Sequence, residues 1–97
     1  MSDKNIIITG FESCSHFYQA CIFASMCKKH GLCKDYTMKS FATRLDYLEW
    51  LKIFKEKHFF CDSKFKNHKS CPLVYLDNDQ YIGGCDNLKI WFRNRTK

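Results

Sequence analysis

The chain has 97 residues, of which 45% are hydrophobic and 16% aromatic. This length suits one domain, residues 1–97, around a single core, and the apolar content excludes a disordered chain. The formal net charge of +6 favours anionic partners but does not choose between a small molecule and a polymer.

The first half of the chain predicts a strand, a helix and a second strand. Residues 5–9 (NIIIT) are continuous and β-branched, which is typical of a buried strand, and Gly10 ends the run. Apolar residues at helical spacing then predict a helix within residues 13–31, and they are Phe17, Ala20, Cys21 and Ala24. Ser13 suits the N-cap of this helix and Gly31 suits its C-terminal end. Residues 33–41 (CKDYTMKSF) alternate weakly and predict the second strand.

The second half predicts a helix, a hairpin and a final helix. A helix is expected over residues 43–60, with Thr43 and Asp46 as a capping box. Its expected apolar side consists of Leu45, Leu48, Leu51 and Phe54. Residues 61–70 form a polar, lysine-rich loop, and residues 72–76 and 80–83 flank a turn at 77–79 whose Asp and Asn residues tolerate positive φ. Helical spacing returns in residues 85–97.

These elements follow one another in the order β-α-β-α-β-β-α, without a repeat, a linker or a low-complexity segment. The helix between the first two strands implies a right-handed parallel crossover, and the last two strands pair as a hairpin. The sequence therefore predicts an α/β protein with a mixed four-stranded sheet flanked by helices.

No membrane span is expected, because the apolar runs are only a few residues long. The N-terminal stretch MSDKNIIITG has too short an apolar block for a signal peptide, so we expect a cytoplasmic protein. In such a compartment most of the seven cysteines should be free thiols, and their odd number agrees with this. They are Cys14, Cys21, Cys27, Cys33, Cys61, Cys71 and Cys85.

Two short motifs in the C-terminal half resemble those of a known family. Pro72 is the single proline of the chain and precedes a strand, and a Gly-Gly pair follows the next strand. Ser70-Cys71-Pro72 partly matches the "TVP" of the glutaredoxins, and residues 82–88 (IGGCDNL) closely match their "IGGCDD-L". In element order the resemblance spans essentially the whole chain. It implies a thioredoxin-like fold.

The resemblance also implies a function. Glutaredoxins are thiol-disulfide oxidoreductases, so we expect glutathione as co-substrate and thiol-containing proteins as partners. Cys14, which opens the first helix, would be the nucleophile that reduces glutathione mixed disulfides. In the family the proline is cis and faces this cysteine, which assigns glutathione orientation to Pro72 and Cys71. The residues expected to hold the carboxylates and the amine of glutathione are Lys69, Gly84, Cys85 and Asp86.

The active motif departs from the family pattern. Residues 14–17 read Cys-Ser-His-Phe, where glutaredoxins have Cys-Pro-Tyr-Cys or, in one monothiol branch, Cys-Gly-Phe-Ser. With Phe17 in place of a second thiol, the expected cycle is of the monothiol type. The mismatch with Cys-Gly-Phe-Ser disfavours an iron–sulfur cluster. Phe11 replaces the lysine that the family usually carries three residues before the cysteine.

The residues themselves leave two hypotheses open at Cys14. Helix N-termini favour a thiolate through their free N–H groups, and a protonated His16 would add positive charge. The alternative is an inert cysteine in a non-catalytic interaction protein that keeps only the scaffold. Cys71 has the same two readings, a displaced resolving thiol or a buried small hydrophobe.

Metal and nucleic acid are both disfavoured. The spacings Cys27-x2-His30-x2-Cys33 and Cys61-x6-His68-x2-Cys71 contain zinc-type ligands but no paired Cys-x2-Cys, so no metal site is predicted. No nucleic-acid-binding signature accompanies the basic residues. Those residues are Lys64, Lys66, Lys69, Arg93 and Arg95.

Overall fold

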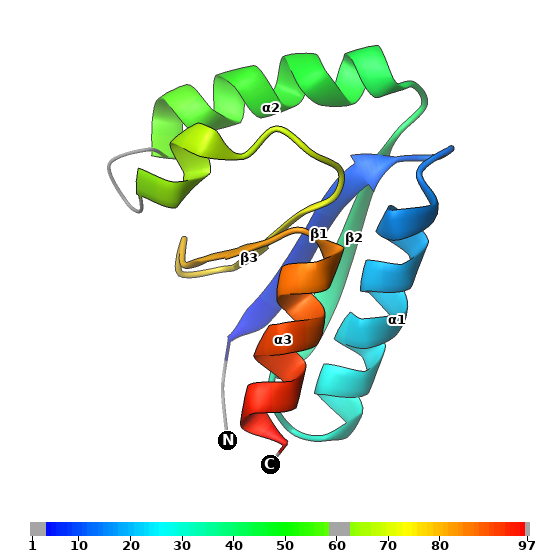
Figure 1. Ribbon diagram of the computed structural model, residues 1–97, viewed down its shortest axis with the longest axis vertical. Helices are drawn as coiled ribbons and strands as arrows, with labels where there is room; N and C mark the ends of the chain where they lie inside the picture. Colours follow the sequence, from blue (N-terminus) through cyan, green and yellow to red (C-terminus); the bar gives the residue numbers. More distant parts are fainter. Residues whose placement is uncertain (1–3, 59–62, 97) are drawn as a thin grey trace.

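The computed structural model describes residues 4–58 and 63–96, which form a four-stranded sheet with helices on both faces (Figure 1). The elements in chain order are β1 (Asn5–Phe11), α1 (Ser15–Lys29), β2 (Asp35–Phe41), α2 (Arg44–His58), the 3-10 helix η1 (Ser63–Asn67), β3 (Leu73–Leu76), β4 (Tyr81–Gly83) and α3 (Cys85–Arg95). The mixed-sheet α/β fold expected from the sequence is confirmed.

The sheet has the strand order β2-β1-β3-β4. β1 pairs in parallel with β2, as the crossover through α1 requires, and antiparallel with β3. β3 and β4 form the expected hairpin, with Asp79 in the turn at φ 65°. β1 lies in the interior of the sheet. The residues that follow its C-terminal end, at Phe11, lie at one end of the molecule.

The two faces of the sheet carry different cores. On one face α1 and α3 lie side by side (Figure 1) and bury Ile6, Ile8 and Val74 together with residues such as Ala20 and Leu88. On the other face α2 and η1 cover an aromatic cluster whose buried members are Tyr47, Leu51, Phe54, Phe65 and Leu73. Alternation along the strands explains the division, because neighbouring residues point to opposite faces.

Several local predictions from the sequence differ from the structure. Cys14, not Ser13, is the N-cap of α1. Leu45 is exposed, because the buried stripe of α2 runs instead through Tyr47, Leu51 and Phe54. Thr43 does accept a hydrogen bond from the backbone N–H of Asp46, as half of a capping box would. The segment expected as a loop over 61–70 contains η1 from residue 63 onward.

Other features agree with the sequence or lie outside the described part of the chain. Gly31 follows α1 with φ 74°, as its position predicted. The predicted end of the second helix at residues 59–60 lies outside the described residues, and so does Cys61. The remaining six cysteines are free thiols. Within the described residues, no helix has the length and apolar character that crossing a membrane requires.

Candidate functional site

Cys14 lies between the end of β1 and the start of α1. Its backbone is extended, with φ −87° and ψ 111°, and its N–H donates to the carbonyl of Phe11 at 3.0 Å. As the N-cap, its own carbonyl accepts from the N–H of Phe17 at 3.2 Å. The half-buried side chain places Sγ 3.8 Å from the carbonyl oxygen of Cys71. The first turn of α1 therefore presents a thiol to the segment before β3.

That segment is the loop of residues 68–72, and its last peptide bond, between Cys71 and Pro72, is cis. Pro72 is buried, whereas Lys69 and Ser70 are exposed. Cys71 is half-buried and packs against both cores of the protein. The loop thus sits at the end of the sheet, between the two layers of helices.

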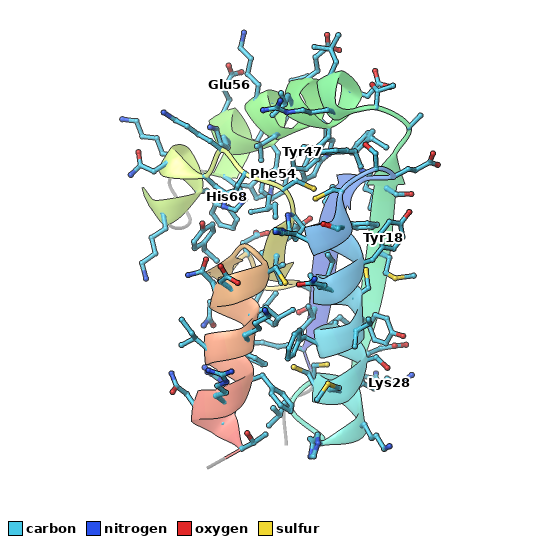
Figure 2. The ribbon with its side chains drawn as sticks, turned by 45° about the vertical axis from the view of Figure 1, so that its right-hand side comes forward. Tyr18, Lys28, Tyr47, Phe54, Glu56 and His68 are labelled. Carbon is cyan, nitrogen blue, oxygen red and sulfur yellow. The ribbon has the colours of Figure 1, made fainter. Side chains whose placement is uncertain are left out.

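Two buried side chains hold the backbone of this loop. Tyr47, on α2, donates its hydroxyl to the carbonyl of Ser70 at 2.7 Å. His68 places Nε2 at 2.9 Å from the carbonyl oxygen of Ser70 and 3.1 Å from that of Pro72. Both side chains lie beneath α2 in Figure 2. Since these hydrogen bonds go to the backbone, they fix the path of the loop whatever side chains it carries.

The protonation state of His68 follows from its partners. Two carbonyl oxygens face Nε2, so this nitrogen carries a hydrogen. Burial lowers the pKa of His68 below its ordinary value of 6.5, which favours the neutral ring. Nδ1 then accepts from the hydroxyl of Tyr81, 2.6 Å away. The imidazole links β4 to the loop as a neutral hydrogen-bonding bridge.

The thiols around Cys14 are not equivalent. Burial and the hydrogen bond with Cys14 raise the pKa of Cys71 to about 12, against a smaller lowering by the backbone of Phe11. Burial also raises the pKa of Cys85. The charge of Lys89 opposes this rise, and the charges of Asp86 and Cys14 add to it. Cys85 has its Sγ 3.9 Å from Oε1 of Gln19. Both neighbours of Cys14 are therefore protonated at neutral pH.

Two pockets meet at the loop. One, of about 350 Å³, is basic at its edge and is lined by Phe11, Arg44, Tyr47, Leu48, Lys69, Ser70 and Cys71. The other, of about 340 Å³, is lined by His16, Ser70, Cys71, Gly84, Cys85, Asp86 and Asn87. Ser70 and Cys71 form the wall that the two pockets share. One extended ligand that crosses this wall would pass the backbone of Cys71.

The second pocket is closed by the start of α3. Gly84 is the N-cap of α3, and its N–H donates to Oδ1 of Asn87 at 3.1 Å. A Cβ on Gly84 would lie 3.7 Å from the carbonyl oxygen of Pro72, so the turn and the loop are close neighbours. Gly83, at φ 130°, has no room for a side chain beside Asn87. The N-terminus of α3 faces this pocket with free N–H groups.

The structure brings most of the sequence-predicted site residues to these two pockets. His16 is exposed and lines the second pocket, and Asp86 is exposed beside Lys89, with Nζ 3.8 Å from Oδ1. Lys69 is on the opposite side of the shared wall, in the first pocket. Cys71 lines both pockets, whereas Cys14 and Pro72 line neither: Cys14 contacts the shared wall through its Sγ, and Pro72 follows Cys71 in the chain.

Sequence reasoning missed the residues that support the loop. Tyr47 belongs to an i, i+4, i+7 pattern with Leu51 and Phe54, which competes with the pattern chosen from the sequence. His68 precedes Pro72 by four residues but was weighed only as a zinc ligand. Arg44, at the start of α2, lines the pocket beside Phe11. The position of Arg44 in this pocket depends on how α2 crosses the sheet, so neighbouring residues in the sequence do not predict it.

No group of three or more His, Cys, Asp or Glu side chains within residues 4–58 and 63–96 is arranged to hold a metal ion. His68 uses both ring nitrogens for the hydrogen bonds that hold the loop. Its geometry is that of a structural group.

Comparison with known proteins gives a structural match alone. No protein-family model and no curated protein matches the sequence. Among solved structures, the chain is similar to glutaredoxin 1 from Francisella tularensis, crystallised in complex with cacodylate. The TM-score is 0.54 at 16% sequence identity, and the match covers 97% of this chain and 99% of that one. The likeness establishes a thioredoxin-like α/β fold.

Proposed function

We propose that the protein is a thiol-disulfide oxidoreductase that uses glutathione and that Cys14 is its nucleophile. The observation that carries the proposal is the position of Cys14 Sγ, 3.8 Å from the carbonyl oxygen of Cys71, because Cys71 lines both pockets. A disulfide that lies across this wall presents its sulfur to Cys14. The glutaredoxin-type fold supports the same class of chemistry.

Glutathione matches the two pockets in shape and charge. It is a short, extended peptide with a carboxylate at each end and an ammonium group beside one of them. The basic pocket offers Arg44 and Lys69 to the glycine carboxylate. In this assignment Arg44 supplies the positive charge that is lost where Phe11 replaces the lysine of the glutaredoxins.

The other pocket suits the γ-glutamyl end. The N–H groups at the start of α3, around Gly84 and Cys85, favour a carboxylate, and the carboxylate of Asp86 is exposed to receive the ammonium. Between the pockets, the backbone of Cys71, held in place by Pro72, would pair with the cysteine of glutathione. The glutathione sulfur is then directed toward Cys14.

The reaction proceeds by two thiol-disulfide exchanges. Cys14, as thiolate, attacks the glutathionyl sulfur of a protein mixed disulfide, and the protein sulfur leaves and takes up a proton. A second glutathione thiolate attacks the glutathionyl sulfur on Cys14, so that oxidised glutathione leaves and Cys14 is restored. His16, exposed in the same pocket, favours the anionic states when it is protonated. No other thiol of the active motif is needed.

The test is a glutathionyl-exchange assay with a mixed disulfide formed from glutathione and hydroxyethyl disulfide. The purified wild-type protein should accelerate exchange, and Cys14→Ser should return the rate to the background. Cys33→Ala is the matched control, because Cys33 is a buried thiol packed beside the backbone of Ile6, outside both pockets. This variant should retain the wild-type rate.

Two results would overturn the proposal. One is background exchange by a wild-type protein that is folded by circular dichroism. The other is undiminished exchange by Cys14→Ser. If Cys14 also stays unmodified while other surface groups react with an alkylating agent, the non-catalytic interaction protein is the better description.

A further inference from the structure

We propose that Cys71 is a second redox-active thiol, which forms a disulfide with Cys14 and lets the protein reduce protein disulfides as well as glutathione mixed disulfides. This inference rests on the proposed function, because it needs Cys14 to act as the nucleophile. It adds a resolving residue outside the active motif, 57 positions along the chain from Cys14.

The two cysteine side chains are direct neighbours. The Sγ of Cys14 lies 3.8 Å from the carbonyl oxygen of Cys71, and the two thiols also hydrogen-bond to each other. Both side chains are half-buried, so they lie at the floor of the site, within reach of a disulfide brought to Cys14. A disulfide requires neighbouring backbones of this kind, since the Cβ atoms must come within about 4.5 Å.

The Cys71 sulfur packs over β1 at Gly10. A Cβ built on Gly10 would lie 2.8 Å from Sγ of Cys71 and 2.6 Å from the ring of Phe17. Glycine at this position of β1 therefore opens the space that the sulfur and the ring occupy. Phe17 fills the place of a second thiol in the motif, and Cys71 is the sulfur that packs beside Cys14 in its stead.

Cys85 is a weaker candidate for the same role. The charge of Cys14 contributes to the raised pKa of Cys85, so the two are near, but the Sγ of Cys85 is directed to Oε1 of Gln19 at 3.9 Å. It lies at the start of α3, in one of the two pockets only. Cys71 belongs to the wall between the pockets, where the reacting disulfide must pass.

The resolving step balances without an external oxidant. When Cys14 is bound to a substrate sulfur, the thiol of Cys71 loses its proton and attacks Sγ of Cys14. The bond between the two cysteines forms, the bond from Cys14 to the substrate breaks, and the released substrate sulfur takes up the proton. When the substrate is a protein disulfide, the substrate protein gains two electrons and two protons and leaves as a dithiol. Two glutathione molecules then reduce the Cys14–Cys71 disulfide and leave as oxidised glutathione.

The roles of the two thiols are set by their surroundings. Cys71 stays protonated in the resting state, because burial and the hydrogen bond with Cys14 raise its pKa to about 12. Cys14 is accordingly the first nucleophile. Once Cys14 is part of a mixed disulfide, its contribution to the raised pKa of Cys71 is removed.

The direct test is mass spectrometry of wild-type protein treated briefly with one equivalent of oxidised glutathione and quenched with acid. The expected product has lost two hydrogens, and peptide mapping should place the new link between Cys14 and Cys71. Cys27 and Cys33 also lie close to each other, because the charge of Cys33 raises the pKa of Cys27. The treatment is therefore repeated in the Cys33→Ala background, where the same link should form.

Two variants complete the mass analysis. Cys71→Ser and Cys71→Ala should each retain one glutathione on Cys14, because no thiol remains to displace it. Both replacements are used so that a folding defect in one does not decide the result. A stable glutathione adduct on Cys14 in the wild type, with no Cys14–Cys71 link, would overturn the inference.

Activity separates this inference from the proposed function. With glutathione as reductant, wild-type protein should reduce the disulfides of insulin, and the Cys71 variants should be severalfold slower. The same variants should lose less of their rate of exchange on the mixed disulfide of glutathione and hydroxyethyl disulfide than of their rate on insulin, because exchange needs one thiol only. Equal rates on insulin for wild type and variants would reject Cys71 as a resolving thiol and leave the glutathione chemistry of Cys14 intact. Loss of exchange in the wild type itself would reject the proposed function.

Discussion

The two faces of the sheet are built from different kinds of contact. Beneath α1 and α3 the core is aliphatic and sulfur-containing, with fully buried residues such as Ile6, Ile8 and Leu88. Beneath α2 the core is aromatic, and its rings carry polar groups that bond to backbone carbonyls. Apolar contacts are non-directional and supply stability. The hydrogen bonds of Tyr47 and His68 are directional and fix one loop.

The two cores meet at Cys71. It packs against both cores and stands between Cys14 and the two pockets. We therefore expect changes beneath α1 and α3 to lower stability and leave the chemistry of the folded protein intact. Changes beneath α2 should lower stability and disturb the chemistry together.

The largest effect is expected at Tyr47, which is fully buried. Tyr47→Ala should destabilise the protein by about 3–5 kcal/mol, as loss of a large buried ring does. Tyr47→Phe keeps the ring and removes only the hydrogen bond to Ser70, so it should cost about 1 kcal/mol. It should also slow glutathionyl exchange. Urea denaturation and the exchange assay measure the two effects, and wild-type exchange by Tyr47→Phe would show that α2 does not position the loop.

Leu88→Ala is the counterpart on the opposite face. Leu88 is fully buried in the core formed with α1, and its truncation should cost about 2–5 kcal/mol. Exchange by the folded variant should stay close to the wild-type rate, measured at a temperature well below its melting transition. A large loss of rate in protein shown to be folded would contradict the division between the faces.

Gly10→Ala should disturb the boundary between the faces. The added Cβ would meet both the ring of Phe17 and the sulfur of Cys71, which must shift to make room. Overpacking of this kind costs about 1–3 kcal/mol. We also expect less Cys14–Cys71 disulfide after treatment with oxidised glutathione, measured by peptide mapping. An unchanged yield would show that the position of the Cys71 sulfur does not depend on Gly10.

A smaller effect is expected from the cation that α2 contributes to the basic pocket. Arg44→Ala should weaken glutathione binding only severalfold, because an exposed charge is screened by solvent. Lys52→Ala is the matched control, since Lys52 is an exposed cation of α2 that lines a different pocket. The apparent KM for glutathione measures both. Equal values for the two variants would place the glycine carboxylate elsewhere.

The smallest effect concerns pH. Because the pKa of His68 is lowered in the folded protein, the unfolded chain takes up a proton at higher pH than the folded one. The contribution of this group to stability is complete above about pH 6.5 and is lost as the pH falls toward the lower, folded-state value. His68→Gln keeps a donor toward the loop and does not titrate, so its stability should fall less between neutral and mildly acidic pH. Urea denaturation at several pH values in this range measures the free energy of unfolding of both proteins. The same dependence of this free energy on pH in wild type and variant would contradict the assignment.

The sequence by itself determined the order of the elements and the position of Cys14 at the start of a helix. A strand is predicted by the continuous β-branched residues in NIIIT, and a helix by the apolar spacing of Phe17, Ala20 and Ala24. Both patterns involve residues that are close in the sequence, so they can be recognised without the tertiary structure. The motif IGGCDNL and the position of Cys14 at a helix start are local as well. Their outcome in the structure is a mixed sheet of the expected order with Cys14 at the N-cap of α1.

Only the tertiary structure decided which side chains hold the loop and which line the pockets. The sequence predicts an apolar side of α2 that consists of Leu45, Leu48, Leu51 and Phe54. In the structure Leu51 and Phe54 are buried, but Leu45 is exposed, Leu48 is half-buried and Tyr47 joins the buried stripe. His68 became a bridge to the loop because Tyr81, brought alongside by the β3–β4 hairpin, satisfies its other nitrogen. The contact between Cys14 and Cys71 spans 57 positions of the chain. Such contacts form where distant segments of the chain meet, so the spacing of the two residues in the sequence does not predict them.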